Sequence, residues 1–149
     1  MASAHVVYAT ITGNNEDVAD IITDKLEELG VDVEETEISQ TDAEELNDVD
    51  ICVVCPYTYD EGELPEEGMD FYEDLQDLDL TGKVYGVAGS GDVFYEDDFN
   101  VAVDAFSTAF KTAKATQGAD DVKINLEPDE EDIQTLDAFV EKIVAKANA

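Results

Sequence analysis

Two hydrophobic patterns alternate along the chain. Short, nearly continuous apolar runs predict buried β-strands, and longer segments with an apolar residue at every third or fourth position predict amphipathic helices. The expected strands cover residues 5–9, 31–38, 50–55, 84–88 and 122–126. The first expected helix has its apolar positions between residues 18 and 29, and a short second helix begins at residue 41. Three further helices are expected at 65–75, 99–113 and 128–147. Five strands alternating with five helices predict an α/β fold with a mostly parallel sheet.

The second and third helices have recognisable start signals. Thr41 and Glu44 have the spacing of a capping box, and Pro65 is followed by two glutamates, which is typical of a first helical turn. The 149 residues, 44% of them hydrophobic, suffice for one domain with its own core. No linker, repeat or low-complexity segment divides the chain, so we expect residues 1–149 to form a single domain.

The segment Thr10-Ile11-Thr12-Gly13-Asn14-Asn15 joins the first expected strand to the first expected helix. Free N–H groups and the partial positive charge of a helix amino terminus point into such a turn, and the threonines and asparagines add side-chain donors. This combination predicts a phosphate pocket. The alternative is a capped helix with Thr12 or Asn14 as the N-cap. The segment is neither a P-loop nor a dinucleotide fingerprint, since it lacks Gly-Lys-Ser/Thr and has one glycine.

Two further loops should lie at the same edge of the sheet, because they follow the carboxyl ends of the third and fourth expected strands. Ligands of such folds bind at this edge. They are residues 56–64 and 89–98, and each contains tyrosine and glycine. Two aromatic rings can enclose a flat ring, and glycines let backbone N–H groups approach it. Each tyrosine alone is more typical of an ordinary loop, but the three loops together predict a site for a mononucleotide with a large planar ring.

The chain is extremely acidic, with 39 acidic residues, seven lysines, no arginine and a net charge of −32. Such a surface repels nucleic acid and anionic membranes and attracts basic protein partners. The alternative is a well-solvated surface, adapted to high salt. No apolar run is long enough to span a membrane and no signal peptide is present, so the expected location is the cytoplasm.

Cys52 and Cys55 have C-x-x-C spacing but lie inside an expected strand. An odd separation on a strand points the two side chains to opposite faces, which argues against a redox pair or a metal site. His5, the single histidine, is expected to be structural.

Together the three loops resemble those of the flavodoxins, and the resemblance extends over nearly the whole chain. The family pattern Thr/Ser-x-Thr-Gly-Asn-Thr corresponds to residues 10–15. The family's second loop resembles Tyr57-Thr58-Tyr59 with Gly62-Glu63-Leu64-Pro65, and its third loop resembles Gly89-Ser90-Gly91-Asp92 with Tyr95. Because the fifth strand has no long insertion, the chain is similar to the short-chain group. The resemblance implies a three-layer sandwich with a five-stranded parallel sheet in the order 2-1-3-4-5 and helices on both faces.

The resemblance also implies non-covalently bound FMN and a low-potential one-electron carrier rather than an enzyme. We expect a monomer that shuttles electrons between a flavodoxin or ferredoxin reductase and acceptor enzymes, docking through basic faces of these partners. Tyr59 corresponds to the family's inner aromatic residue and Tyr95 to the outer one. The implied cofactor-binding residues are Thr10, Ile11, Thr12, Gly13, Asn14, Asn15, Pro56, Tyr57, Thr58, Tyr59, Asp60, Gly62, Ser90, Gly91, Asp92 and Tyr95.

Two positions depart from the family pattern. Asn15 replaces a threonine and keeps a side-chain donor, so phosphate binding should be retained. Asp60 replaces a glycine common after the inner aromatic residue, where the resemblance implies that the peptide reorients on reduction. Since positive φ costs a non-glycine residue about 1 kcal/mol, we expect Asp60 to bring the two one-electron potentials closer together.

The acidic loops predict a low potential for the second electron. One carboxylate about 12 Å from the flavin in a water-like medium opposes a new negative charge by about 0.3 kcal/mol. For one electron this is roughly 10–15 mV, so several carboxylates should lower that potential by several tens of millivolts.

Three alternatives use a similar fold. An FMN-dependent quinone or azo reductase would need a nicotinamide pocket and usually longer loops, and a flavodoxin-like activator of manganese ribonucleotide reductase would also carry FMN. A phospho-acceptor receiver domain is excluded, because its acidic and lysine positions hold Thr10, Pro56 and Glu127.

Overall fold

The computed structural model describes residues 3–8, 14–56, 69–91, 101–125 and 129–147. The strands are β1 (Ser3–Tyr8), β2 (Asp32–Glu37), β3 (Ile51–Cys55), β4 (Val84–Gly91), β5 (Thr116–Gln117) and β6 (Val122–Asn125). The α-helices are α1 (Asn14–Glu28), α2 (Met69–Gln76), α3 (Val101–Thr112) and α4 (Glu130–Ala147), and two 3-10 helices, η1 (Ile38–Gln40) and η2 (Ala43–Asp48), follow β2.

The strands form one parallel sheet in the order β2-β1-β3-β4-β5, with β6 also paired to β4. The predicted parallel α/β fold and strand order are confirmed. The predicted fifth strand at 122–126 corresponds to β6, which pairs with Ala88–Gly91 at the end of β4. A further strand of two residues, β5, pairs with Val84 and Tyr85 at the start of β4 and was not predicted. Gly118 lies between β5 and β6, and a Cβ there would be 2.6 Å from Val84 Cγ1, so the chain passes close to β4 at this point.

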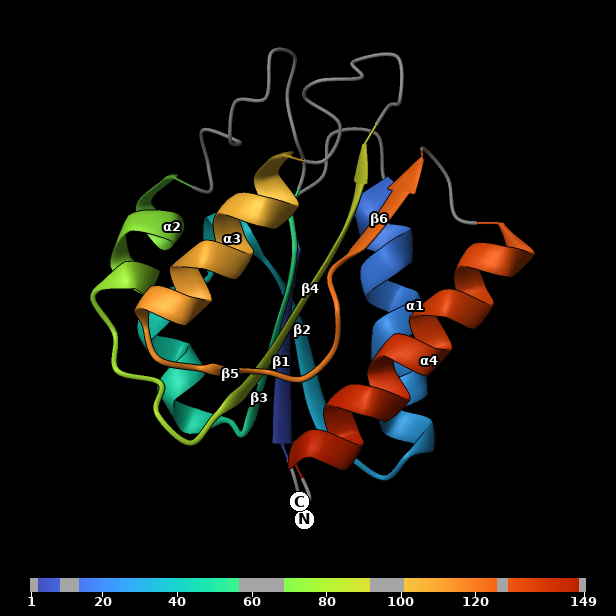
Figure 1. The fold of residues 1–149 in the computed structure, drawn as a ribbon, viewed down its shortest axis with the longest axis horizontal. Helices are drawn as coiled ribbons and strands as arrows, with labels where there is room; N and C mark the ends of the chain where they lie inside the picture. Colours follow the sequence, from blue (N-terminus) through green and yellow to red (C-terminus); the bar gives the residue numbers. More distant parts are fainter. Residues whose placement is uncertain (1–2, 9–13, 57–68, 92–100, 126–128, 148–149) are drawn as a thin grey trace.

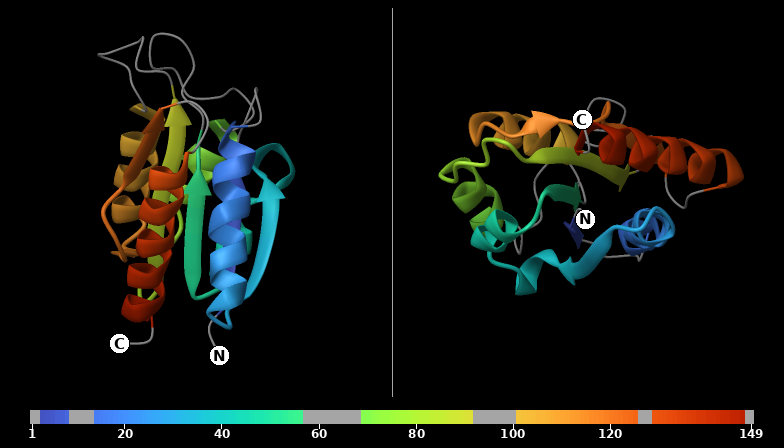
Figure 2. Two further views of the ribbon diagram at one scale, coloured as in Figure 1. Left: turned by 90° about the vertical axis from the view of Figure 1, so that its right-hand side faces the viewer. Right: turned by 90° about the horizontal axis from the view of Figure 1, so that it is seen from below.

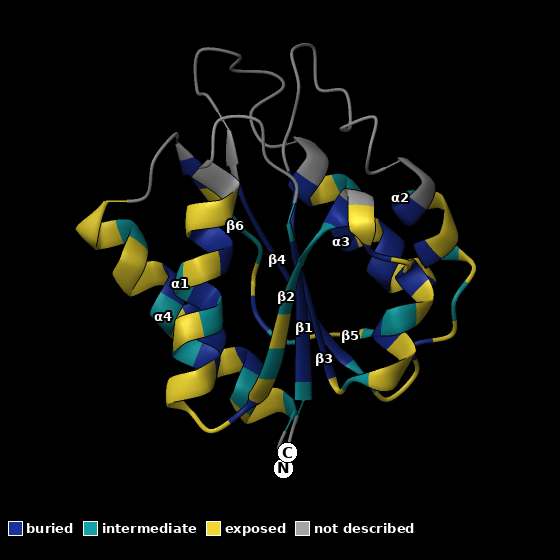
Figure 3. Cartoon of the chain, turned by 180° about the vertical axis from the view of Figure 1, so that it is seen from behind, coloured by how far each residue is buried: buried dark blue, intermediate teal, exposed yellow. Residues whose placement is uncertain are grey.

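Helices cover both faces of the sheet and bury two separate cores (Figure 1). Helices α1 and α4 pack on one face, and α2, α3 and η2 on the other. Figure 2 shows that β1 begins and α4 ends at the same end of the molecule, opposite the carboxyl ends of the strands. Buried residues concentrate along β1, β3 and β4, whereas the edge strand β2 is half exposed (Figure 3).

The side chains of Cys52 and Cys55 lie on opposite faces of the sheet, as their odd spacing on a strand predicts. Cys55 lies in the core under α1 and α4, and Cys52 in the core under α2 and α3. Both are free and buried. His5 is buried, and its Nε2 lies 2.7 Å from Thr36 Oγ1, in keeping with the predicted structural role.

A glycine allows α4 to approach the sheet closely. A Cβ at Gly86 would collide with Ile143 Cδ1 and lie 2.7 Å from Phe139 Cζ. A side chain at Gly86 would therefore displace the side chains of Ile143 and Phe139 on α4.

Several predicted details are wrong. The second helix is a 3-10 helix whose N-cap is Asp42 rather than Thr41, and the Asp42 N–H donates to Glu45 Oε2 at 2.8 Å. The Thr41 hydroxyl is engaged elsewhere, donating to the Glu37 carbonyl at 2.7 Å. Leu29 follows the end of α1 and is 39% exposed, so it does not belong to the predicted apolar face.

The other helix predictions have mixed outcomes. Among the apolar residues expected to face the core from the helix at 128–147, Ile133 is 39% exposed, whereas Leu136, Val140 and Ile143 are buried on α4. The apolar face of the third predicted helix is confirmed by buried Phe71 and Leu75 on α2. The predicted helix starts at 65, 99 and 128 lie outside the described residues.

Candidate functional site

The carboxyl ends of β1, β3, β4 and β6 lie at one edge of the sheet, together with the amino end of α1 (Figure 1). Parallel pairing produces this arrangement, and Tyr8 and Cys55, the last residues of β1 and β3, are register partners. The three predicted loops therefore all start or end at this edge. In open α/β sheets this is the ligand-binding edge.

The amino end of α1 supplies the described part of the predicted phosphate pocket. Asn14 and Asn15 form the start of this helix, so their backbone N–H groups are among those without an intrahelical acceptor. Asn14 lies within the first turn rather than before it, which disfavours Asn14 as the N-cap. Glu16 and Asp17 follow in the same turn and place negative charge near the helix dipole.

The ends of β3 and β4 approach each other closely around Gly89. A Cβ at Gly89 would lie 2.7 Å from the Pro56 carbonyl oxygen and 2.8 Å from Val103 Cγ2 on α3. Pro56 and Gly89 are both buried. Gly89 thus allows the exit of β3, the end of β4 and the first turn of α3 to pack closely together at this edge.

Five predicted site residues fall within the described ranges, and all five lie at this edge. Asn14 and Asn15 begin α1, Pro56 follows β3, and Ser90 and Gly91 end β4. The remaining predicted site residues lie outside the described residues: Thr10, Ile11, Thr12, Gly13, Tyr57, Thr58, Tyr59, Asp60, Gly62, Asp92 and Tyr95.

A group of acidic side chains lies between α1 and the strands β1 and β2. The Tyr8 hydroxyl donates to Glu16 Oε2 at 2.9 Å, and burial together with this carboxylate raises the pKa of Tyr8 to about 12. The Thr23 hydroxyl donates to Glu35 Oε1 at 2.6 Å. Burial, and secondly the neighbouring Asp20 carboxyl, raise the pKa of Glu35 to about 7. Local sequence patterns do not predict either contact, because eight and twelve residues separate the partners.

The cysteines do not contribute a reactive or metal-binding group. Burial raises the pKa of Cys52 to about 12 and raises the pKa of Cys55 still further above its ordinary value. Within the described ranges, no group of three or more His, Cys, Asp or Glu side chains is arranged to hold a metal ion. None of the helices in these ranges is long and apolar enough to cross a membrane.

A separate open hollow of about 290 Å³ lies between the β5–β6 connection and α4. Asp120, Asp121 and Lys142 are its charged residues. Burial raises the pKa of Asp121, and its Oδ1 is buried without a hydrogen-bond partner. None of the lining residues ends a strand, so this hollow is distinct from the candidate ligand edge.

Comparisons with known proteins agree with this geometry. The flavodoxin family model matches residues 6–138. Probable flavodoxin 1 of Bacillus subtilis strain 168 is 36% identical over 149 residues, covering 99% of this chain and 94% of the relative. A solved short-chain flavodoxin associated with a PDU bacterial microcompartment is 63% identical with a TM-score of 0.97, covering 99% of each chain. The flavodoxin of Streptococcus pneumoniae TIGR4 is 51% identical with a TM-score of 0.95, covering 97% of this chain and 99% of that one.

Proposed function

The chain belongs to the flavodoxin family, and from this premise we propose that it carries single electrons on a non-covalently bound FMN and is not itself an enzyme. The observation that carries the proposal is the family match along nearly the whole chain. The described part of the ligand edge supports this proposal, because it places the amino terminus of α1 beside the carboxyl ends of the parallel strands. FMN supplies the one-electron chemistry when bound, and the protein orients it and adjusts its potential.

The predicted site residues divide between the two ends of the cofactor. Residues 10–15 and the amino end of α1 would bind the phosphate through N–H and side-chain donors, without help from a lysine in that segment. Tyr59 and Tyr95 would lie against the two sides of the flavin ring and exclude water from it. The remaining residues would line the edge of the ring and the loop that follows β3: Pro56, Tyr57, Thr58, Asp60, Gly62, Ser90, Gly91 and Asp92.

We also propose the class of partner. The loops at the ligand edge contain many carboxylates and no lysine, which favours a reductase and acceptor enzymes with basic docking faces. A monomer in the cytoplasm remains our expectation.

Reductive titration with dithionite, followed by visible absorption, tests the proposal directly. We expect added FMN to bind to the purified protein and to be reduced in two successive one-electron steps. Failure to bind FMN would contradict the proposed function. Two results together would instead favour the reductase alternative: reduction of the flavin in a single two-electron step, and oxidation of NADPH by the protein with a quinone as acceptor and no added reductase.

The acidic third loop is expected to lower the potential of the second electron. Neutralising Asp92, Glu96 and Asp97 together should raise that potential by several tens of millivolts at low salt, and by less at high salt. A control neutralises three exposed carboxylates at the opposite end of the molecule: Asp24, Glu27 and Asp32. Equal shifts in both triple variants would contradict a local effect.

Asp60 provides a second test of how the loops adjust the flavin. Asp60→Gly should separate the two one-electron potentials further, because glycine adopts positive φ without strain. Potentials that are unchanged by this substitution would contradict the proposed role of the loop.

A further inference from the structure

The last residues of β4 take their position from β6. Strand β3 pairs with β4 only along Val84–Val87. Beyond that point, Ala88–Gly91 pair with β6 alone among the described strands. Ser90 and Gly91, which we assign to the flavin site, are therefore held in place by a strand of only four residues.

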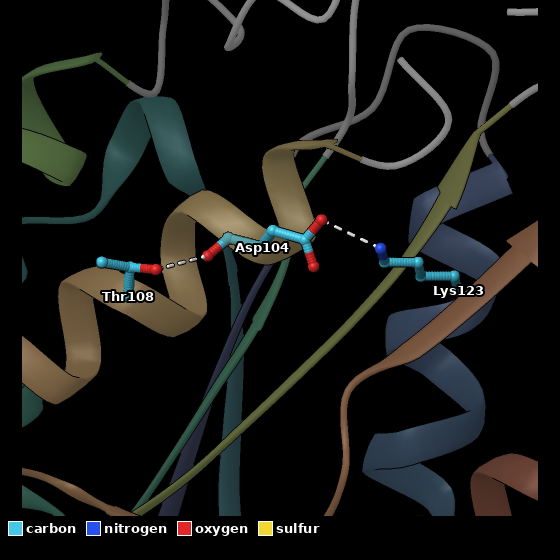
Figure 4. Close-up of polar contacts among 3 residues, drawn as sticks. All are labelled: Asp104, Thr108 and Lys123. Atoms are coloured by element: carbon cyan, nitrogen blue, oxygen red, sulfur yellow. Dashed lines mark hydrogen bonds and ion pairs between the residues drawn. The ribbon is translucent and has the colours of Figure 1, made fainter. Parts of the chain in front are cut away.

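Strand β6 is anchored differently on its two faces. Ile124 is buried in the core under α1 and α4. Because side chains alternate along a strand, Lys123 faces the other side, toward α3. Its Nζ donates to Asp104 Oδ2 at 2.9 Å, and Figure 4 shows the lysine extending from β6 toward the helix. The two faces of β6 thus have one apolar and one ionic attachment.

Gly89 brings the two partners of this ion pair within reach. Gly89 is the register partner of Lys123 on β4, and a Cβ there would lie 2.8 Å from Val103 Cγ2. The first turn of α3, which contains Val103 and Asp104, therefore lies close against the sheet beside β6. A side chain from β6 needs to cross only a glycine to meet it.

The position of Lys123 is exceptional among the lysines of the chain. It lies on the strand that ends at the ligand edge, one residue before the register partner of Ser90. The other six lysines lie in the second halves of α1, α3 and α4, directly before β4 or shortly after α3: Lys25, Lys111, Lys142, Lys146, Lys83 and Lys114.

We propose that Lys123 is a positioning residue for the FMN site, acting through Asp104 to hold β6 against α3 and so to fix Ser90 and Gly91. This inference rests on the proposed function. The pair is partly exposed, with 36% of the lysine and 59% of the aspartate side chain accessible, and such pairs add little to global stability. Its effect should therefore be local to the end of β4.

Two neutralising variants separate positioning from simple electrostatics. Lys123→Gln and Asp104→Asn both break the ion pair, but they change the net charge in opposite directions. Positioning predicts that both weaken FMN binding by the apoprotein, each by about two- to fivefold. Exchange of the two residues, Lys123→Asp with Asp104→Lys, should restore affinity to within about twofold of wild type. Lys146→Gln, a neutralised lysine in the last turn of α4, is the control and should leave affinity unchanged.

Amide hydrogen exchange in the apoprotein gives a readout that does not depend on FMN. In both single variants, the amides of Ala88–Gly91 should exchange faster than in wild type, whereas those of α1 should not change. A midpoint potential of the bound flavin that shifts in the same direction in both variants would also support positioning.

Three outcomes overturn the inference. Unchanged affinity and exchange in Lys123→Gln, or opposite changes of affinity in the two single variants, would overturn positioning while leaving the proposed function intact. A wild-type chain that binds no FMN would overturn both.

Discussion

Two outer strands of the sheet, β2 and β6, differ in their pairing and in the charges that they carry. Strand β2 pairs with β1 at six register positions and contains four carboxylates among its six residues. Strand β6 pairs with β4 at four positions and contains a single charged residue, Lys123. Against the neighbouring helix, Glu35 of β2 meets the acidic Asp20, whereas Lys123 meets Asp104.

The difference in charge accompanies a difference in ladder length, with six register pairs for β2 and four for β6. Charged residues at both edges discourage pairing with a further strand. In the longer β2 ladder, Glu35 lies beside another acidic residue, Asp20 of α1, and its pKa is raised to about 7. The shorter β6 ladder is supplemented by opposite charges and a buried side chain. The end of β4, at the candidate ligand edge, thus pairs with the strand that has the shorter of these two ladders.

The largest expected effect comes from removing the apolar attachment of β6. Ile124 is 1% exposed, so Ile124→Ala should lower the free energy of unfolding by about 2–4 kcal/mol through lost burial and a cavity. Val33→Ala, at a half-buried position of β2, should lower it by about 1 kcal/mol. Urea denaturation of both variants measures the difference. Equal losses would show that the two edges are anchored alike.

An intermediate effect is expected from the acidic contact at β2, and it depends on pH. The pKa of Glu35 is raised from 4.5 to about 7, so the folded chain binds this proton more tightly than the unfolded chain. The resulting stability is fully present below about pH 4.5 and is lost as the pH rises through about 7. Glu35→Gln imitates the protonated form. At about pH 8.5 it should raise the free energy of unfolding by about 1 kcal/mol, a value discounted for solvent screening.

Glu34→Gln is the matched control for this substitution. Glu34 is the exposed neighbour on β2, so its replacement removes the same net charge without removing the contact with α1. Urea denaturation at about pH 5 and about pH 8.5 compares the variants, since the gain for Glu35→Gln should shrink at the lower pH. A gain of equal size in both variants would indicate relief of general charge repulsion instead.

The smallest effect is expected at the contact between Tyr8 of β1 and Glu16 of α1. Tyr8→Phe removes the hydroxyl that donates to Glu16 and should lower the free energy of unfolding by about 0.5 kcal/mol. A double-mutant cycle with Glu16→Gln isolates the contact. Additive effects would show that this hydrogen bond does not contribute to holding α1.

Local patterns predicted the layers of the fold well, because they reflect burial. The apolar runs gave β1, β3 and β4, and the odd spacing of Cys52 and Cys55 placed them in different cores. Strand β5 was missed because its two residues, Thr116 and Gln117, are polar and exposed, so no periodicity marks them. Its pairing depends on β4, which is distant in sequence.

The candidate site was predictable as an edge but not in its internal contacts. Asn14, Asn15 and Pro56 could be placed there because strand order and the carboxyl-end rule fix their position. The close packing at Gly89 depends on Val103 and Pro56, which no local pattern relates to it. For the same reason, the contact of Lys123 with Asp104 required three-dimensional information.

The separation of Cys52 and Cys55 by the sheet has a practical consequence for electrochemistry. Both thiols are buried and their pKa values are raised, so the folded chain presents no reactive thiolate to alkylating reagents. A single cysteine introduced at the exposed Lys146 would therefore react alone, with the native cysteines left in place. Because α4 ends opposite the carboxyl ends of the strands, attachment there would orient the ligand edge away from an electrode.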